Sequence, residues 1–440
     1  MLDYRTLWRW HFYAGLFCIP FVVLLALTGA IYLFKPQLEA AADRDVQGLV
    51  LAGSPASAGV QVAAALAAVP GTRLQYYELP RAADSGVRVH LVGGDGGRSI
   101  VYVHPGTAAV LKIVDPDTRI AEFVKTIHGE LFLGKPGSWL VELAGSWAIV
   151  MVLTGLYLWW PRGASGLGGV LYPRFSRGAR VGWRDLHAVF GAWVSLLALF
   201  LLLTALPWTE VWGGALKRVR AIGASAPVVQ DWSANRADEH AEHRREAAAL
   251  AAGGERTAVS LDQVVNRVMP LGLAPPVLVQ PPHRGVANWS IKAESQNRPL
   301  RATLQVDART GEVLEFVPFR DRPLVDRVIG IGVAAHEGQL FGLANQLLGL
   351  FAATGLVTLC VSGVVMWWRR RPDGVLGAPP PPGVPAALGP GLVTLIVALG
   401  LLLPLPGLSL VLVALTDRLL VVNAPRLRAW FGLRTRHGVT

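Results

Sequence analysis

The sequence has very little cysteine, with only Cys18 and Cys360 in 440 residues, each inside an apolar run. Two isolated thiols exclude a disulfide framework and a cysteine-based zinc site, and the lack of a Cys-x-x-Cys-His motif excludes covalently attached c-type haem. Charged residues are scarce at 16%, whereas hydrophobic residues reach 52%. This composition excludes an ordinary soluble protein and indicates membrane helices that alternate with folded aqueous segments.

The net charge of +11 is concentrated in short segments beside the apolar runs. The N-terminus, residues 161–185, residues 369–387 and the tail from Asp417 together hold 15 Lys and Arg but only four acidic residues. Positive charge in short loops marks the cytoplasmic side of a membrane protein. We therefore expect both termini in the cytoplasm, and no basic excess remains for nucleic acid.

Six apolar spans divide the chain. They predict an α-helical membrane protein with about six transmembrane helices and two small α+β extracytoplasmic domains, arranged as an internal duplication. The last apolar run fits either a helical hairpin or one kinked helix, and its length favours the hairpin. The expected boundaries are spans at 1–34, 139–162, 186–208 and 343–371, a two-helix hairpin at 388–424, extracytoplasmic domains at 35–138 and 209–342, a cytoplasmic loop at 163–185, a linker at 372–387 and a tail at 425–440.

Each long loop ends in a similar strand-turn-strand pattern. Residues 101–111 and 304–314 alternate apolar and polar positions around a turn that contains Gly, Pro or Asp, which predicts two β-hairpins. Alanine-rich stretches at 60–69 and 242–252 predict one helix in each loop. His240 and His243 fall beside the second stretch, where a solvated helix face is the simplest interpretation.

Four histidines stand at the ends of apolar spans in repeat-related positions. His11 and His187 each follow a Trp-Arg pair and precede a glycine by four residues, whereas His128 and His336 precede the second and fourth spans. A span of about 20 residues rises roughly 30 Å, so the topology places the first pair near the cytoplasmic face and the second pair near the outer face. The pattern predicts two bis-histidine sites stacked across the membrane.

Two imidazoles without a carboxylate or thiolate make a poor zinc site, but they are sufficient as the axial ligands of haem. A single histidine at a membrane interface is more often structural, whereas four in a repeated, paired pattern favour a function. We therefore expect His11 with His187, and His128 with His336, to bind the iron of two b-type haems. Glycines 15 and 191 would leave room for a porphyrin face.

For other polar residues, the sequence gives weaker indications of a functional role. Glu142 fits either a proton- or propionate-linked group or an ordinary interfacial carboxylate. Arg9 and Arg184 suit an anionic electron donor or haem propionates on the cytoplasmic side. His90, His104 and His283 lie in the outer loops, where surface positions are expected.

The histidine-led helices, the Leu-Thr-Gly-Leu-Tyr-Leu-Trp-Trp-Pro-Arg segment that closes the second span and the Val-Tyr-Val-His-Pro hairpin resemble the PepSY-associated transmembrane family. The likeness extends over nearly the whole chain, including the C-terminal Leu-Pro-Leu-Pro-Gly hairpin. It implies a bacterial inner-membrane protein linked to iron uptake, since some members are similar to haem-containing ferrisiderophore reductases. The alternative is a haem-free membrane protein whose PepSY-like domains bind peptide or inhibit a protease.

The resemblance implies a di-haem b electron-transfer protein that reduces a ferric siderophore, or another ferric chelate, at the periplasmic face. No flavin or nicotinamide motif is present, so a cytoplasmic or quinol donor must supply the electron, with membrane lipid as the other partner. The repeat is imperfect. The third span has Thr204-Ala205 where the first has Thr28-Gly29, and we expect this difference not to touch the histidines.

Overall fold

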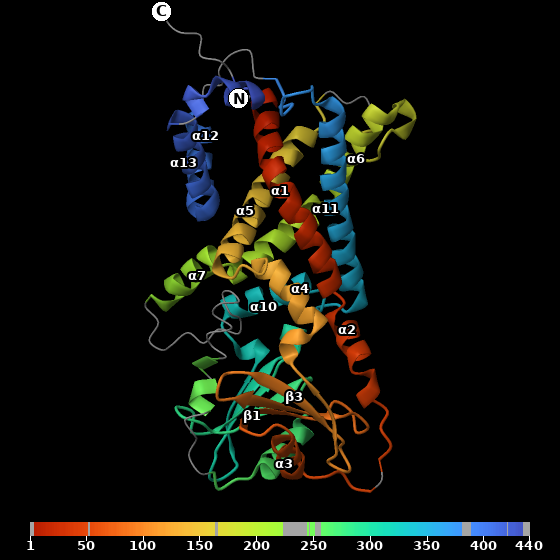
Figure 1. Cartoon of the computed structure of the whole chain (residues 1–440), viewed down its shortest axis with the longest axis vertical. Helices are drawn as coiled ribbons and strands as arrows, with labels where there is room; N and C mark the ends of the chain where they lie inside the picture. The colour runs from red at the N-terminus through yellow and green to blue at the C-terminus, as the bar shows by residue number, and fades with distance from the viewer. Residues whose placement is uncertain are drawn as a thin grey trace, which may run out of the picture. The chain divides into compact units, whose positions relative to one another are not determined.

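The computed structural model describes residues 4–51, 53–162, 166–222, 244–245, 247–250, 257–380, 389–419 and 421–433. These residues form two compact units, each built from segments that are far apart in the sequence (Figure 1). Within the helix expected at 242–252, the described residues 244–245 and 247–250 are helical, whereas His240 and His243 lie outside the described residues. The membrane unit consists of Met1–Ala30, Ile127–Val228 and Leu347–Thr440, and the sheet unit of Ile31–Thr126 and Val229–Gln346.

Four helices in the described part of the chain are long and apolar enough to cross a membrane. The shortest has 25 residues, which gives about 37 Å at 1.5 Å per residue, and a bilayer core needs about 30 Å. The helices extend past the apolar runs, so that polar residues of the first turns, such as Arg9 and His11, are helical too. They are α1 (Tyr4–Tyr32), α5 (Lys135–Trp159), α6 (Ala179–Ala205) and α11 (Leu343–Arg370).

The C-terminal apolar run forms a hairpin of two short helices, α12 (Pro390–Leu402) and α13 (Pro404–Leu419), which lie side by side (Figure 1). A Cβ atom on Gly407 would lie 2.6 Å from the carbonyl oxygen of Gly400, so the two backbones meet directly near the turn. This packing shows that the run is a hairpin and not one kinked helix. With 13 and 16 residues, however, the helices reach only about 20 and 24 Å. The structure thus has four full spans and a short hairpin where six spans were expected.

The turn of the hairpin packs against the other helices, whereas most of the remaining apolar side chains of the hairpin are exposed. Leu403 at its turn is only 2% exposed and packs with Ile149 of α5 and with Leu206. The indole N–H of Trp147 on α5 donates a hydrogen bond of 3.0 Å to the hydroxyl of Ser409 on α13. The described part of the membrane unit also contains five short helices, namely η3 (Phe175–Arg177), η4 (Leu206–Trp208), α7 (Val211–Ala221), η8 (Val421–Asn423) and α14 (Pro425–Trp430).

The sheet unit is built on one antiparallel sheet of eight strands in the order β4-β3-β2-β1-β5-β6-β7-β8. The two loops each supply four strands, and the halves join where Tyr77 and Glu78 of β1 pair with Val279 and Leu278 of β5. Both predicted hairpins are confirmed, as β3–β4 and β7–β8. The strands are β1 (Thr72–Glu78), β2 (Val87–Gly93), β3 (Arg98–Val103), β4 (Val110–Val114), β5 (Val277–Gln280), β6 (Trp289–Ala293), β7 (Ala302–Val306) and β8 (Val313–Pro318).

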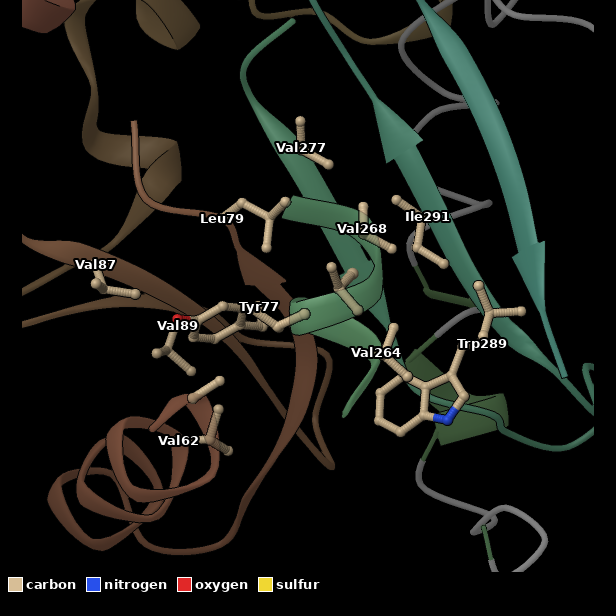
Figure 2. Packing of buried hydrophobic residues seen from close by; sticks show 14 of the residues in the cluster. Val62, Tyr77, Leu79, Val87, Val89, Val264, Val268, Val277, Trp289 and Ile291 are labelled. Atoms are coloured by element: carbon tan, nitrogen blue, oxygen red, sulfur yellow. The ribbon is translucent and has the colours of Figure 1, made fainter. Parts of the chain in front are cut away.

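One hydrophobic core serves both halves of the sheet, which differs from the expectation of two separate small domains. Helices α3 (Ala58–Ala68) and α9 (Leu261–Val268) contribute to the same cluster, together with Tyr77 and Ile291 from different halves (Figure 2). The backbone N–H of Gly59 on α3 donates to Asp262 on α9 at 2.9 Å. Because α3 and α9 contact one another on one face of the sheet, the two halves share a single core.

Two helices connect the sheet to the spans, α4 (Ile120–Glu130) and α10 (Leu324–His336). The expected helix at 60–69 is confirmed as α3. The remaining short elements of the sheet unit are α2 (Lys35–Ala42), η1 (Arg44–Val46), η2 (Pro116–Thr118), η5 (Met269–Leu271), η6 (Arg298–Leu300) and η7 (Phe319–Asp321).

Candidate functional site

His11 on α1 is hydrogen-bonded to a neighbouring helix. Its Nδ1 lies 2.9 Å from the hydroxyl oxygen of Thr154 on α5, and that hydroxyl lies 2.8 Å from the carbonyl oxygen of Val150. A threonine hydroxyl has a single proton, and here it goes to the carbonyl four residues earlier. The hydroxyl oxygen therefore accepts from Nδ1–H of His11, which leaves the lone pair of the ring on Nε2.

His128, in the last turn of α4, is hydrogen-bonded to a threonine of another helix in the same way. Its Nδ1 lies 2.9 Å from the hydroxyl oxygen of Thr28 on α1, which donates to the carbonyl of Leu24 at 2.8 Å. By the same proton count, His128 carries its hydrogen on Nδ1. Helix α1 thus takes part in both contacts, because it supplies a histidine to Thr154 on α5 and a threonine to His128 on α4.

His187 on α6 reaches the same tautomer by another route. Its Nδ1 lies 3.0 Å from the carbonyl oxygen of Leu359 and 3.1 Å from the hydroxyl oxygen of Ser362, both on α11. A carbonyl oxygen only accepts hydrogen bonds, so Nδ1 is the protonated nitrogen. Three of the four predicted histidines therefore present an Nε2 lone pair, which is the atom that a metal or haem iron binds.

Each of these three rings also packs against a glycine next to its hydroxyl partner. A Cβ atom on Gly155 would lie 3.3 Å from Cε1 of His11, one on Gly29 would lie 3.3 Å from Cε1 of His128, and one on Gly363 would lie 3.5 Å from Cε1 of His187. These contacts were not predicted, although a Thr-Gly or Ser-Gly pair in three spans is a visible signal. The expectation that Thr28-Gly29 does not touch a histidine is wrong, because both residues contact His128.

The two glycines expected to open a porphyrin face have a different role. A Cβ atom on Gly15 would lie 3.3 Å from the methyl group of Met151, and one on Gly191 would lie 3.4 Å from a methyl group of Leu359. Both glycines therefore allow close packing of neighbouring helices.

The membrane unit brings His11 and His187 together, since the two imidazoles are close enough for their charges to interact. His128 also belongs to the membrane unit, whereas His336 belongs to the sheet unit, so the pairing of these two stays a prediction. His336 is the last residue of α10. The amide N–H of Asn345 donates to the carbonyl of Ala335 at 2.9 Å and fixes this helix end.

Among the residues that the structure describes, no group of three or more His, Cys, Asp or Glu could hold a metal ion. A structural zinc ion requires four protein ligands, which the histidine pair does not provide. Haem brings four nitrogen ligands of its own and needs only axial ligands from the protein. The donor set at His11 and His187 therefore fits haem better than a bare ion.

Glu142 is assigned to a structural role. It is 3% exposed, and its two oxygens accept hydrogen bonds from the backbone N–H groups of Val211 and Trp212 at 2.7 and 2.9 Å. These are the first two residues of α7, so Glu142 caps that helix at its positive end. A proton- or propionate-linked role is not supported by this geometry.

Arg9, which was expected to suit an electron donor or haem propionates, instead forms hydrogen bonds within the chain. It is 8% exposed, and its guanidinium donates to the carbonyl oxygens of Pro379 and Gly432 and to the hydroxyl of Tyr13. Tyr13 in turn donates to the carbonyl of Phe431 at 2.5 Å. Arg9 therefore ties α1 to the chain on both sides of the C-terminal hairpin and does not face an electron donor. The side chain of Arg184 is 59% exposed, although it pairs with Asp185 at 2.6 Å.

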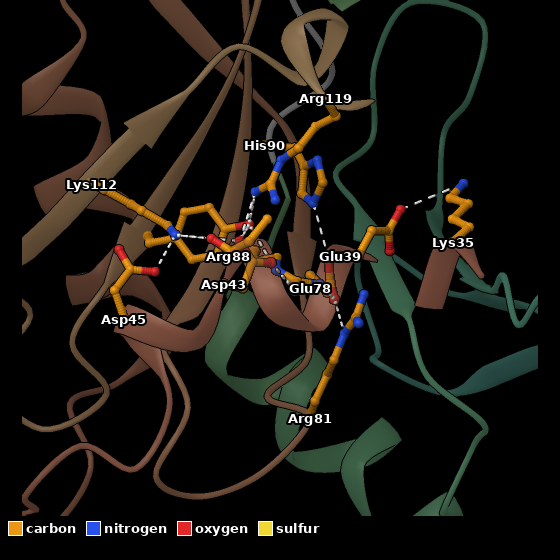
Figure 3. Close-up of polar contacts among 12 residues, drawn as sticks. Lys35, Glu39, Asp43, Asp45, Glu78, Arg81, Arg88, His90, Lys112 and Arg119 are labelled. Carbon is orange, nitrogen blue, oxygen red and sulfur yellow. Dashed lines mark hydrogen bonds and ion pairs between the residues drawn. The ribbon is translucent and has the colours of Figure 1, made fainter. Parts of the chain in front are cut away.

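The sheet carries a buried charged layer on the face opposite α3 and α9 (Figure 3). Asp43 contacts Arg88 at 2.7 Å and Arg119 at 2.8 Å, and it accepts a hydrogen bond from Tyr102 at 2.9 Å. Burial opposes ionisation of Asp43, but its hydrogen bonds and the two arginines lower the pKa below its ordinary value. This network joins the chain that leaves α1 to the start of α4.

Glu78 extends this layer through Arg88 at 2.9 Å and Arg81 at 2.7 Å. Burial again disfavours its charged form, but the hydrogen bond with His90 and the two arginines lower the pKa of Glu78 to about 2. His90 lies 3.1 Å from Glu78, so it is part of this network rather than an isolated surface residue. His104 accepts from the backbone N–H of Gly106 at 3.1 Å and stabilises the β3–β4 turn.

Comparison with known proteins agrees with the architecture. A search of curated proteins gave no match to this chain. The family model described as the PepSY-associated TM region matches residues 8–370, which include all four spans, both halves of the sheet and the four predicted histidines. The C-terminal hairpin lies beyond the matched residues, so the likeness is less extensive than the sequence suggested. With more than four-fifths of its length matched, the chain is a membrane protein of the PepSY-associated transmembrane family.

Proposed function

We propose that this protein carries electrons across the membrane on two b-type haems and reduces a ferric chelate, such as a ferric siderophore, on the side of the sheet unit. His11 and His187 would hold the inner haem, and His128 and His336 the outer one. The observation that carries the proposal is the shared tautomer of three histidines from both repeats, each held with a lone pair on Nε2.

The hydrogen bonds on Nδ1 suit axial ligands for a physical reason. A ligand histidine that donates its other N–H to an oxygen is fixed in rotation and is a stronger base toward iron. Thr154 and Thr28 provide that oxygen for His11 and His128, and Leu359 provides it for His187. Haem, when bound, supplies one-electron chemistry, and a bis-histidine site leaves iron no open position for oxygen.

Reduction releases iron because of the chelator's donor atoms. Hard oxygen donors hold Fe³⁺ much more tightly than Fe²⁺, so one electron delivered to the bound Fe³⁺ converts it to Fe²⁺ and loosens the complex. The electron comes from a separate donor, quinol or cytoplasmic, since the chain has no flavin or nicotinamide motif. The excess of basic residues at one side of the spans marks that side as cytoplasmic, and His11 and His187 would receive the electron near it.

Stopped-flow absorbance tests the proposal on the purified chain. Dithionite-reduced protein should be reoxidised by a ferric siderophore, with Fe²⁺ captured by a ferrous chelator. The variant His336→Ala should lose this reaction, whereas His283→Ala, a histidine of the same unit that contacts the carbonyl of Pro281, should keep it. Undiminished reduction by His336→Ala would contradict the proposed route, and protein without haem would favour a peptide-binding or protease-inhibiting role.

A further inference from the structure

Helix α10 presents an apolar face outward and a charged residue inward. Leu324, Val328 and Ile331 are 67%, 61% and 43% exposed, and their spacing places them on one side of the helix. The opposite side contains Asp326 and Val333, which are 6% and 1% exposed. A helix in water would show the reverse pattern, so the medium against the exposed stripe of α10 is apolar.

Helix α4 repeats this feature in the other half of the chain. Ile120 and Phe123 are 61% and 55% exposed, whereas Ala121 and Val124 are 3% and 4% exposed. Each helix is followed by exposed apolar residues before the next span begins. These residues are Phe132 at 55% and Leu133 at 58% after α4, and Phe341 at 73% after α10. Leu343, the first residue of α11, is also 61% exposed.

The turn after α4 is built to expose its aromatic residue. Leu131 and Phe132 have φ angles of +53° and +57°, in the left-handed region that bulky residues rarely adopt. This conformation costs free energy and leaves the ring of Phe132 half exposed. In water the exposed ring would bring no compensating gain, whereas contact with an apolar medium would.

The position of both stripes in the chain identifies that medium as lipid. Helix α4 ends at Glu130 and the span α5 begins at Lys135, while α10 ends at His336 and α11 begins at Leu343. Four and six residues separate these helices from apolar spans that must lie in the bilayer. A second copy of the chain would have to cover two separate repeat-related stripes, whereas one bilayer surface covers both.

We infer that α4 and α10 lie along the membrane surface, with their apolar stripes inserted among the lipid chains. In-plane amphipathic helices of this kind sit about 5–10 Å into the boundary between head groups and acyl chains. The contact would fix the depth of both helices in the membrane, and with it the depth of His128 and His336 in their last turns. The inference stands whether or not these histidines bind haem.

Spin labels on introduced cysteines test this contact in nanodiscs of phosphatidylcholine and phosphatidylglycerol. The native Cys18 and Cys360 are 3% and 8% exposed, so labelled wild-type chain gives the background. Labels at Val328→Cys and Phe123→Cys should collide several-fold more often with oxygen, which concentrates in lipid, than with a water-soluble nickel chelate. A label at Val60→Cys, on a 53% exposed valine of α3, should show the opposite preference.

Two results would overturn the inference. Preferential collision of the labels at residues 328 and 123 with the nickel chelate would place both stripes in water. Low collision rates with both reagents, together with spin–spin broadening, would indicate a second copy of the chain instead of lipid. Comparable circular dichroism spectra of the three variants and the wild type would show that each chain is folded, so that either result bears on the stripes themselves.

Discussion

The hydroxyl oxygen of Thr154 accepts a hydrogen bond of 2.9 Å from Nδ1 of His11, and so connects the second span to the first. The same kind of contact joins Thr28 of the first span to His128 at the end of α4. In each case the threonine proton is already donated within its own helix, which fixes the direction of the second bond. The orientation of each candidate ligand is therefore set by a helix that does not carry it.

Replacing the acceptor should weaken the site without removing the ligand. In Thr154→Val, Nδ1 of His11 loses its partner, and we expect haem affinity to fall by about 10–100-fold. Haem titration of apo-protein, followed at the Soret band, measures this change. Thr394→Val is the matched control, since that exposed hydroxyl bonds only the Pro390 carbonyl in the described structure. Equal affinities in both variants would mean that the threonine does not support a ligand.

The glycine contacts predict a change in ligand geometry. A methyl group on Gly155 would lie 3.3 Å from the ring of His11, closer than most such contacts, so Gly155→Ala should rotate or displace the imidazole. Electron paramagnetic resonance of the oxidised protein should then show shifted g values for one of two low-spin signals. Gly391→Ala, where a Cβ atom meets nothing within 4 Å, should leave both signals in place.

Arg9 and Tyr13 anchor the chain around the C-terminal hairpin through the carbonyl oxygens of Pro379, Phe431 and Gly432. The double variant Arg9→Ala, Tyr13→Phe removes all of these bonds and should expose residues 371–380 and 425–433 to protease. Cleavage near the C-terminus should become several-fold faster than in wild type, as followed by mass spectrometry. Arg5→Ala, at an exposed arginine of the same helix, should not change the rate.

Glu78 should make the sheet unit sensitive to acid. Its pKa is about 2 in the folded chain against an ordinary value of 4.5, so its stabilisation is complete above about pH 4.5 and is lost as the pH falls toward 2. The shift corresponds to roughly 3 kcal/mol. In Glu78→Gln this contribution is absent, so the variant should unfold at lower temperature at pH 7 and lose less stability on acidification.

Thermal unfolding between pH 3 and pH 7 checks this expectation for Glu78. Asp45→Asn is the control, because Asp45 pairs with Lys112 at 2.6 Å but its side chain is 62% exposed. This variant should follow the wild-type pH profile, since an exposed pair contributes little. Identical profiles for Glu78→Gln and wild type would show that the buried ion pairs do not contribute to stability.

The span pattern and the hairpins were predictable because periodicity and composition act locally. Residues 101–111 and 304–314 carry their own turn signals, and the apolar runs before Trp159-Trp160 and Trp367-Trp368 are too long for ordinary core helices. The merging of the two sheet halves was not predictable. It depends on the pairing of Tyr77 with Val279, about 200 residues apart. The sequence of neither strand indicates which other strand will pair with it.

The sequence singles out the candidate ligands but not the residues that hydrogen-bond to them. His11, His128 and His187 stand out because histidines at span ends recur at corresponding positions of the repeat. Thr154, Thr28 and Ser362 look like ordinary small residues of membrane helices until the packing places them beside the rings. Arg9 was misassigned for a similar reason, since its acceptors are backbone carbonyls that lie about 370 and 420 residues away.

The most direct test of the account is the haem content of purified protein, measured by the pyridine haemochrome spectrum. We predict b-type haem at about two per chain in the wild type. His11→Ala, His187→Ala and the double variant should each retain the same single haem, because both residues serve one site. A wild-type chain without haem, or a double variant that keeps both haems, would contradict the assignment of these histidines as ligands.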